Sequence, residues 1–190
     1  MKLVFAAAAA CLSTMTALAA PQAYSVDPSH TFPSFEADHM GVSVWRGKMN
    51  KSAGKVMLDK EAGTGTVEIT TDLASIDFGQ DALNKWAQGK DFFDVKKYPK
   101  AVFKGTLQGF ADGAPTQAVG ELTLHGVTKP VTLKINTFKC IPHPMFKREL
   151  CGADAFAVFN RDEFGLSAGK EYGFNMDVTL RIQVEAVADK

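Results

Sequence analysis

Histidine is the side chain best suited to acid–base or metal chemistry near neutral pH, and the four histidines of this chain are far apart in the sequence. The short H-x-x-x-H spacing that is typical of zinc ligands does not occur, so we expect no metal site. One histidine, His39, follows Phe35 and Ala37 on the same face of an alternating stretch. This position suits a histidine at the rim of a barrel that hydrogen-bonds to backbone or water. It also suits a polar contact for the head group of an apolar ligand.

Motifs for nucleophilic or phosphate chemistry are also absent from the sequence. There is no G-x-S-x-G elbow, no glycine-rich phosphate loop and no GxGxxG. The aspartates that could act as paired carboxylates, Asp59, Asp72, Asp77 and Asp81, are predicted to lie in turns or on solvent-facing positions. We therefore expect a protein that is not an enzyme and that needs no cofactor.

Residues 1–19 have the pattern of a secretory signal peptide. Lys2 supplies the positive start, an alanine-rich apolar run follows at 3–12, and Ala17-Leu18-Ala19 is a small-x-small cleavage signal. The run is shorter than the roughly 20 apolar residues of a membrane-spanning helix. We predict export to the periplasm with cleavage after residue 19, and cleavage after Ala20 is the alternative.

The remaining residues, 20–190, have the length of one ordinary domain. The whole sequence contains 21 Lys and Arg against 21 Asp and Glu, so no net charge attracts nucleic acid. We predict no integral membrane segment in this part. Two cysteines remain, Cys140 and Cys151, and export to an oxidising compartment favours a disulfide between them over two free thiols.

Alternation of apolar and polar residues, the mark of half-buried strands, recurs along the chain. It is clearest at the C-terminus, where Met176, Val178, Leu180, Ile182, Val184 and Ala186 share one face. Strands are predicted over 24–26, 34–39, 44–49, 55–58, 67–73, 101–107, 119–124, 131–136, 153–159 and 175–186. Short polar turns separate them, which indicates an all-β antiparallel meander that closes into a barrel or packs as a sandwich.

One stretch departs from this pattern. The spacing of apolar residues over 81–89, including Trp86, predicts a short helix with one apolar stripe. It leads into residues 90–105, K-D-F-F-D-V-K-K-Y-P-K-A-V-F-K-G, which place Phe92 and Phe93 in a connection. Loops are usually polar, so these rings must either pack on the protein's own core or cover a cavity.

The inward faces of the predicted strands combine small residues with large rings. A barrel of about eight strands is just wide enough to be filled by side chains or to hold one small ligand. Small residues would leave room inside, and rings would line that room or fill it. The small residues are Ala37, Ala101, Gly105 and Gly120, and the rings are Phe35, Phe103 and Phe174.

Four motifs give the chain a resemblance to the YceI-like family of exported lipocalin-like barrels, which bind polyisoprenoid or similar long-chain lipids. They occur in family order and span nearly all of residues 20–190. They are S-H-T-F-P-S-F-E-A-D-H-M-G at 29–41, D-F-F-D-V-K-K-Y-P-K-A-V-F at 91–103, G-E-L-T-L-H-G-V-T-K-P-V-T-L at 120–133 and F-N-R-D-E-F-G-L at 159–166.

The resemblance implies an extended antiparallel lipocalin-like β-barrel with a helix near one end. It also implies an apolar channel for an isoprenoid tail of quinone or polyprenyl type. Many relatives carry Arg-Asp-x-His-Leu before the D-F-F motif, whereas this chain has L-N-K-W-A at 83–87, so no head-group role carries over from that pattern. The candidate ligand-binding residues are Phe35, His39, Trp86, Phe92, Phe93, Phe103, Phe164 and Phe174.

We therefore predict an exported, periplasmic protein that holds an isoprenoid-type lipid without covalent attachment, for carriage, storage or stress protection. Two alternatives remain open. One is a stress or interaction protein whose barrel is only a scaffold, and the other is an accessory factor or enzyme that acts on a lipid or quinone, with His39 as its most obvious polar group. A homodimer that forms through a strand edge or the barrel mouth is compatible with the sequence.

Overall fold

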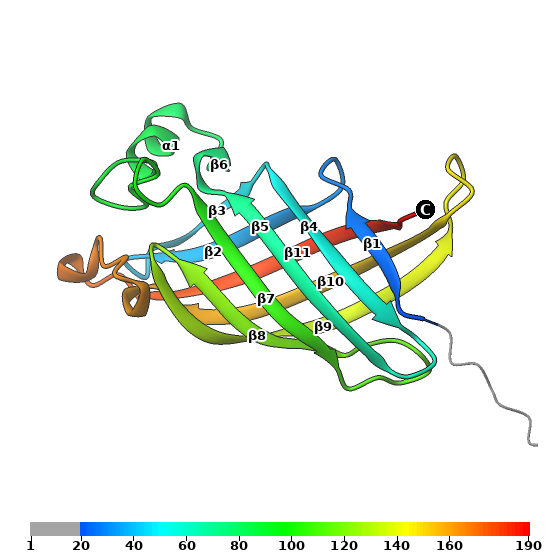
Figure 1. Cartoon of the computed structure of the whole chain (residues 1–190). Coiled ribbons are helices and arrows are strands. Elements are labelled where there is room, and N and C mark those ends of the chain that lie inside the picture. Colours follow the sequence, from blue (N-terminus) through cyan, green and yellow to red (C-terminus); the bar gives the residue numbers. More distant parts are fainter. Residues whose placement is uncertain (1–19) are drawn as a thin grey trace, which may run out of the picture.

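The computed structural model describes residues 20–190, which form an antiparallel barrel of long, tilted strands with one α-helix near one end (Figure 1). The predicted signal peptide, residues 1–19, lies outside the described residues. The strands are β1 (Gln22–Val26), β2 (Phe32–His39), β3 (Ser43–Met49), β4 (Ser52–Asp59), β5 (Thr64–Asp72), β6 (Ile76–Asp77), β7 (Lys100–Gln108), β8 (Gln117–Leu124), β9 (Val127–Pro142), β10 (Glu149–Asn160) and β11 (Asp177–Ala188).

The helical segments are few and short. The α-helix is α1 (Asp81–Ala87), and the 3₁₀-helices are η1 (Leu73–Ser75), η2 (Arg161–Phe164) and η3 (Lys170–Tyr172). Across residues 20–190, none of these helices has the length and apolar character that crossing a membrane requires.

Eight of the strands close into a barrel, in the order β1-β4-β5-β7-β8-β9-β10-β11, because β1 also pairs with β11. Neighbours along this order are antiparallel, and short turns join β4 to β5, β8 to β9 and β9 to β10. This confirms the predicted all-β barrel of about eight strands with a short helix. The two-residue strand β6 was not predicted, because two residues are too few to show alternation.

Alternation decides which side chains face the interior. On β11, Val178, Leu180 and Ile182 point inward, and Arg181 points outward to Glu36 on β2, where its Nε lies 3.0 Å from the carboxylate. The period-two pattern of the sequence therefore appears directly as an apolar inner face and a charged outer face.

The barrel is closed at one end and divided at the other, because β1 and β2 pair in succession with β11. β1 pairs with residues 186–188 of β11, and β2 pairs with residues 178–183. Residues 27–31 form the bend between the two strands, and Thr31 fixes this bend to Glu185. The Thr31 hydroxyl donates to the Glu185 carbonyl at 3.2 Å and accepts from the Glu185 N–H at 3.1 Å.

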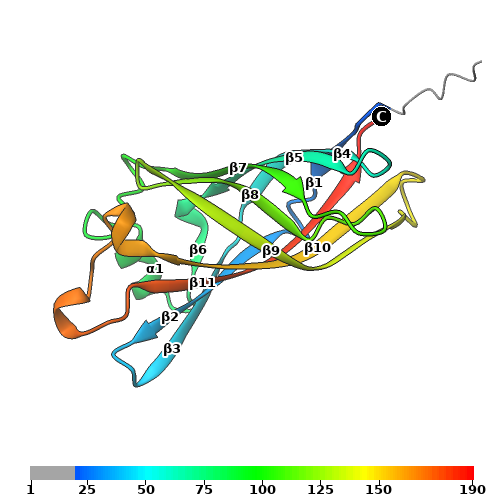
Figure 2. The same ribbon diagram turned by 90° about the horizontal axis from the view of Figure 1, so that it is seen from below.

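Beyond the bend, β2 and β3 leave the barrel wall together. β3 pairs with β2 along its length but with β6 only at Lys48 and Met49. Figure 2 shows β2 and β3 diverging from β7 and β8, with α1 in the space between the two pairs. Both views place α1, the β2–β3 turn and the 161–176 loop at this end, which we call the mouth, and the C-terminus at the other end.

The end opposite the mouth contains a disulfide between Cys140 and Cys151. The two residues lie directly opposite each other on β9 and β10. The bridge fastens the two strands beside the turn that joins them, and it confirms the predicted pairing of these cysteines.

Replacing Thr31 with valine should lower the free energy of unfolding by about 1–3 kcal/mol, because the Glu185 N–H and carbonyl lose a buried partner. The side chain is 1% exposed, so water cannot replace the lost hydroxyl. Thr132→Val, at an exposed position of β9, is the matched control. Urea unfolding of the two variants would contradict this role if their midpoints shifted equally.

Candidate functional site

The barrel encloses an apolar cavity of about 320 Å³ that runs from the mouth toward the disulfide end. This volume is within the range of small-molecule binding sites. The wall includes Trp86 and Phe174 at the mouth, and Tyr24, Phe138 and Cys151 near the other end. The cavity is therefore a long channel with an aromatic entrance.

Small residues on the inner faces keep the channel from being filled. Ala37 and Ala101 line it, as do Ala153 and Ala155 on β10. Each replaces a side chain that would otherwise reach the barrel axis. The inner surface between them is supplied by aliphatic residues of β5, β8, β9 and β11, which offer a ligand dispersion contacts but few hydrogen bonds.

The segment from residue 78 to residue 98 covers the mouth and is held by its own hydrogen bonds. The Phe78 N–H donates to the Asn84 side chain at 2.7 Å, and the Phe93 N–H donates to the Ala87 carbonyl at 3.0 Å. The Asp94 N–H donates to the Gly89 carbonyl at 2.7 Å. These bonds turn the chain back after α1 and direct the two phenylalanines inward.

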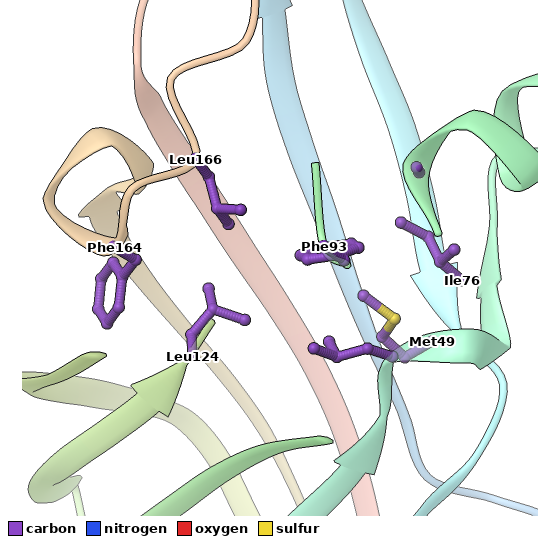
Figure 3. Close-up of a cluster of buried hydrophobic side chains, with 8 residues drawn as sticks. Met49, Ile76, Phe93, Leu124, Phe164 and Leu166 are labelled. Atoms are coloured by element: carbon purple, nitrogen blue, oxygen red, sulfur yellow. The ribbon is translucent and has the colours of Figure 1, made fainter. Parts of the chain in front are cut away.

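The aromatic residues of this segment form a continuous stack. The Trp86 and Phe92 rings lie 5.1 Å apart and nearly parallel, and the centroids of Phe92 and Phe93 are 4.7 Å apart. Phe93 is buried in a cluster with Met49, Ile76 and other apolar residues (Figure 3), whereas Trp86 is 44% exposed. The stack therefore runs from the surface to the core.

The far end of the channel is closed by a polar contact that faces away from the cavity. The Tyr24 ring lines the channel, and its hydroxyl donates to Glu149, which also binds the Lys60 ammonium at 2.6 Å. Burial, together with the Glu149 carboxylate, raises the pKa of the Tyr24 phenol, which stays protonated. For Glu149, burial favours a higher pKa, but Lys60 and Tyr24 outweigh it and lower the pKa.

Two residues whose side chains are charged at neutral pH, Asp38 and Arg161, lie on the channel wall, and both are near the mouth. Asp38 accepts N–H groups from Gly41 at 2.9 Å and from Asn175 at 3.1 Å. Arg161 is only 7% exposed and donates to the carbonyls of Leu166 and Ala168, the latter at 2.7 Å. Burial lowers the pKa of the Arg161 guanidinium, although an arginine stays charged at physiological pH.

The structure brings most of the candidate ligand-binding residues to one wall. Six of them line the channel: Phe35, Trp86, Phe92, Phe93, Phe103 and Phe174. The other two, His39 and Phe164, lie outside the lining. Phe92 and Phe93 both pack on the core and both border the cavity, so the two roles considered for these rings are combined.

His39 takes the first of the two positions that the sequence left open, at the rim of the barrel, because β2 continues past the channel entrance. Its ring stacks on Trp45 at 4.2 Å and meets the edge of Phe174 at 4.9 Å. Both partners line the channel and separate His39 from it. The imidazole thus supports the rim and does not contact the interior.

Phe164, which was also expected to bind the ligand, does not line the channel, for a different reason. It belongs to η2, where the chain leaves β10, and its ring is 1% exposed and packs edge-on against Phe159 at 5.4 Å. Figure 3 shows it at the far side of the cluster from Phe93, beyond Leu124. It is a core residue of the mouth, and Phe159 takes the wall position.

Two glycines that were expected to leave room in the barrel have another role. Gly105 and Gly120 lie opposite each other on β7 and β8, and neither lines the channel. A Cβ on Gly120 would be 2.5 Å from the Gly105 Cα, and one on Gly105 would be 3.1 Å from the Phe103 ring. The glycines permit close contact between two strands and let the Phe103 ring lie over the backbone.

Several wall residues were missed by sequence reasoning. Trp45 and Phe78 contribute rings at the mouth, and Phe78 contacts Phe35 edge-on at 5.2 Å. Trp45 lies in a predicted strand, so alternation could have identified it. Arg161 lies inside the F-N-R-D-E-F-G-L motif, but nothing in a single charged residue indicates that the fold buries it.

A metal site has little support in residues 20–190. The one grouping of three ligand-type side chains there is Cys140, Glu149 and Cys151. The two sulfurs are bonded to each other in the disulfide, so they cannot act as thiolate ligands. This group therefore does not fit a resident metal ion.

Fold and cavity together define the class of this molecule as a closed antiparallel barrel around an apolar channel. Residues 24–186 match the YceI-like domain, and the chain belongs to that family. The UPF0312 protein of Pseudomonas putida strain W619 is 33% identical over 196 residues, which cover all of both chains. A UPF0312 protein of Pseudomonas syringae pv. syringae strain B728a is 31% identical over 95% of this chain and 93% of its own.

Solved structures share the fold at lower identity. Burkholderia cenocepacia BcnA superposes with a TM-score of 0.66 at 22% identity, covering 84% of this chain and 98% of its own. A polyisoprenoid binding domain from Saccharophagus degradans gives a TM-score of 0.63 at 18% identity, with 88% and 99% covered. These likenesses establish a common barrel architecture.

The two phenylalanines of the mouth segment should differ in their contribution to stability. Phe93→Ala should lower the free energy of unfolding by about 3–5 kcal/mol, as for a fully buried ring, and Phe92→Ala should cost clearly less. Phe146→Ala, at a ring that is 52% exposed, should change it by less than about 0.5 kcal/mol. Denaturant unfolding measures all three, and equal losses for Phe92 and Phe93 would contradict this division.

Proposed function

We propose that this protein is an exported carrier that holds an isoprenoid-type lipid, a polyisoprenoid or a quinone, in its apolar channel. Carriage, storage or stress protection would all use the same reversible binding. The observation that carries the proposal is the channel itself, which stays open along the barrel axis and is lined almost wholly by apolar side chains.

The physics of the channel favours a long apolar tail. Removing apolar surface from water is worth about 25 cal/mol per Å². The wall offers such surface from Trp86 at the mouth to Phe138 near the disulfide. A flexible prenyl or acyl chain can follow this length, whereas a compact polar molecule would lose its hydration and gain few hydrogen bonds.

The family and the solved structures support the ligand class. The chain is a YceI-like protein over residues 24–186. The Saccharophagus degradans domain with the same fold is described as polyisoprenoid binding. A shared architecture with a shared apolar interior makes an isoprenoid the first ligand to test.

The structure gives less support to a catalytic reading. His39, the polar group on which such a function would most depend, lies behind Trp45 and Phe174. The hydroxyls of Tyr24 and Thr31 are bonded to other residues of the protein. We therefore favour binding without chemical conversion of the lipid.

Export rests on the signal-peptide pattern of residues 1–19 and fits the disulfide between Cys140 and Cys151. Removing residues 2–19 should retain the protein in the cytoplasm with both thiols reduced. Cell fractionation followed by thiol alkylation and mass measurement would detect this. A periplasmic, oxidised product from the shortened gene would contradict the assignment.

The lipid itself can be tested by extraction. Protein purified from its host and extracted with organic solvent should release a prenyl lipid that mass spectrometry identifies. Ala153→Trp, which fills the channel between β9 and β11, should lower the lipid load at least about tenfold. Ala53→Trp, at an exposed position of β4, should leave the load unchanged.

The proposal fails if the wild-type protein releases no lipid and also binds neither ubiquinone nor long fatty amides in vitro. Circular dichroism of both tryptophan variants checks that a lower load does not come from unfolding.

A further inference from the structure

Arg161 is the one buried cation on the channel wall among residues 20–190. It begins η2, directly after β10 ends at the mouth, and its backbone N–H donates to the Met176 carbonyl at 2.9 Å. This bond fixes the residue beside the start of β11. The side chain is thereby positioned at the boundary between the aromatic entrance and the apolar channel.

Part of the Arg161 side chain has a structural role. One terminal nitrogen donates to the Leu166 carbonyl and the other to the Ala168 carbonyl at 2.7 Å, so the guanidinium holds the turn that follows η2. A guanidinium has five N–H donors. The two carbonyls therefore leave donor capacity unused on a group that borders the channel.

The charge of Arg161 has no carboxylate partner among the described residues. Its neighbour Asp162 binds the Lys170 ammonium at 2.5 Å. Asp38, the other residue of the wall that is charged at neutral pH, accepts backbone N–H groups from Gly41 and Asn175. A buried charge without a counter-ion is costly, and peptide carbonyls offset that cost only in part.

The hydroxyl groups of the wall are already committed to contacts within the protein. The Thr31 hydroxyl bonds Glu185, the Thr71 hydroxyl lies 3.2 Å from that of Ser52, and Tyr24 donates to Glu149. Arg161 therefore remains as the charged donor that a ligand inside the channel can reach.

The surroundings of Arg161 place this donor at one end of a bound lipid. The guanidinium carbon lies 5.7 Å from the Phe92 ring, whose own distance to the Trp86 ring is 5.1 Å. A head group there would lie under the aromatic cover of the mouth. The tail would then extend toward Tyr24, where the wall offers no free donor.

We propose that Arg161 binds an anionic oxygen head group, a carboxylate or a phosphate, of the lipid that occupies the channel. This inference rests on the proposed lipid-binding function and narrows its ligand class to lipids with an anionic head group. A planar guanidinium matches such oxygens with paired, charge-assisted hydrogen bonds. The anion supplies a directly bonded counter-charge, which no carboxylate of residues 20–190 provides.

Matched ligands that differ only in the head group test this inference. Palmitate and hexadecanol share one tail, as do farnesyl phosphate and farnesol. The wild-type protein should bind each anion roughly 10- to 100-fold more tightly than its alcohol at neutral pH. The two pairs separate carboxylate from phosphate recognition, and competition against a fluorescent fatty probe measures all four affinities.

Substitutions at Arg161 should remove this preference and leave alcohol binding intact. Arg161→Gln should bring anion and alcohol within about threefold of each other, and Arg161→Lys should retain part of the difference. Arg181→Gln, on the outer face of β11, is the control for non-specific attraction and should behave as wild type. Thermal unfolding of each variant reports whether the turn after η2 has been lost.

A second readout does not require a variant. In ¹⁵N-labelled protein, the Nε–H resonance of Arg161 should shift on addition of palmitate and should shift far less with hexadecanol. Equal wild-type affinities for anion and alcohol, or an unchanged Nε–H resonance, would overturn the role of Arg161 and leave lipid binding intact. Failure of both members of each pair to bind would overturn the proposed function itself.

Discussion

The whole molecule depends on one edge of β11, which has to serve two strands. Its other edge pairs with β10 along nearly its full length, so β1 and β2 must follow each other along the remaining edge. The bend at residues 27–31 makes this succession possible, and Thr31 ties it to Glu185. Because β1 continues to β4 whereas β2 continues to β3, the same sheet is closed at one end and divided at the other. The mouth is thus a consequence of strand pairing.

A divided sheet leaves apolar inner faces that something must cover. The chain between β6 and β7 covers them, and it does so with rings because its inner surface borders the channel. Phe93 connects this cover to the core through Met49 and Ile76 (Figure 3), and Trp86 remains at the surface. One aromatic stack therefore links the stability of the barrel to the form of its entrance.

The fold could be predicted from the sequence because the alternation of apolar and polar residues shows which side of each strand faces inward and which faces solvent, as on β11. The site could be predicted only in part. His39 follows the alternation of Phe35 and Ala37, but the pattern does not show that β2 extends beyond the channel. Phe164 and Arg161 belong to a 3₁₀ turn, where strand periodicity no longer applies and burial depends on distant segments. Residues of this kind need the tertiary structure before their roles can be assigned.

The placement of polar groups along the channel would determine which lipids the proposed site selects. An apolar cavity with free hydroxyls would attract water, and ordered water would compete with a lipid tail. Here the hydroxyls of Thr31, Thr71 and Tyr24 are hydrogen-bonded to protein partners, so they offer no binding site for water inside the channel. Selection along the tail must then rest on shape and length, and selection by chemistry is confined to the mouth, where Arg161 lies beneath Phe92. Under the proposed function, a binding site divided in this way would accept many tails and distinguish few head groups.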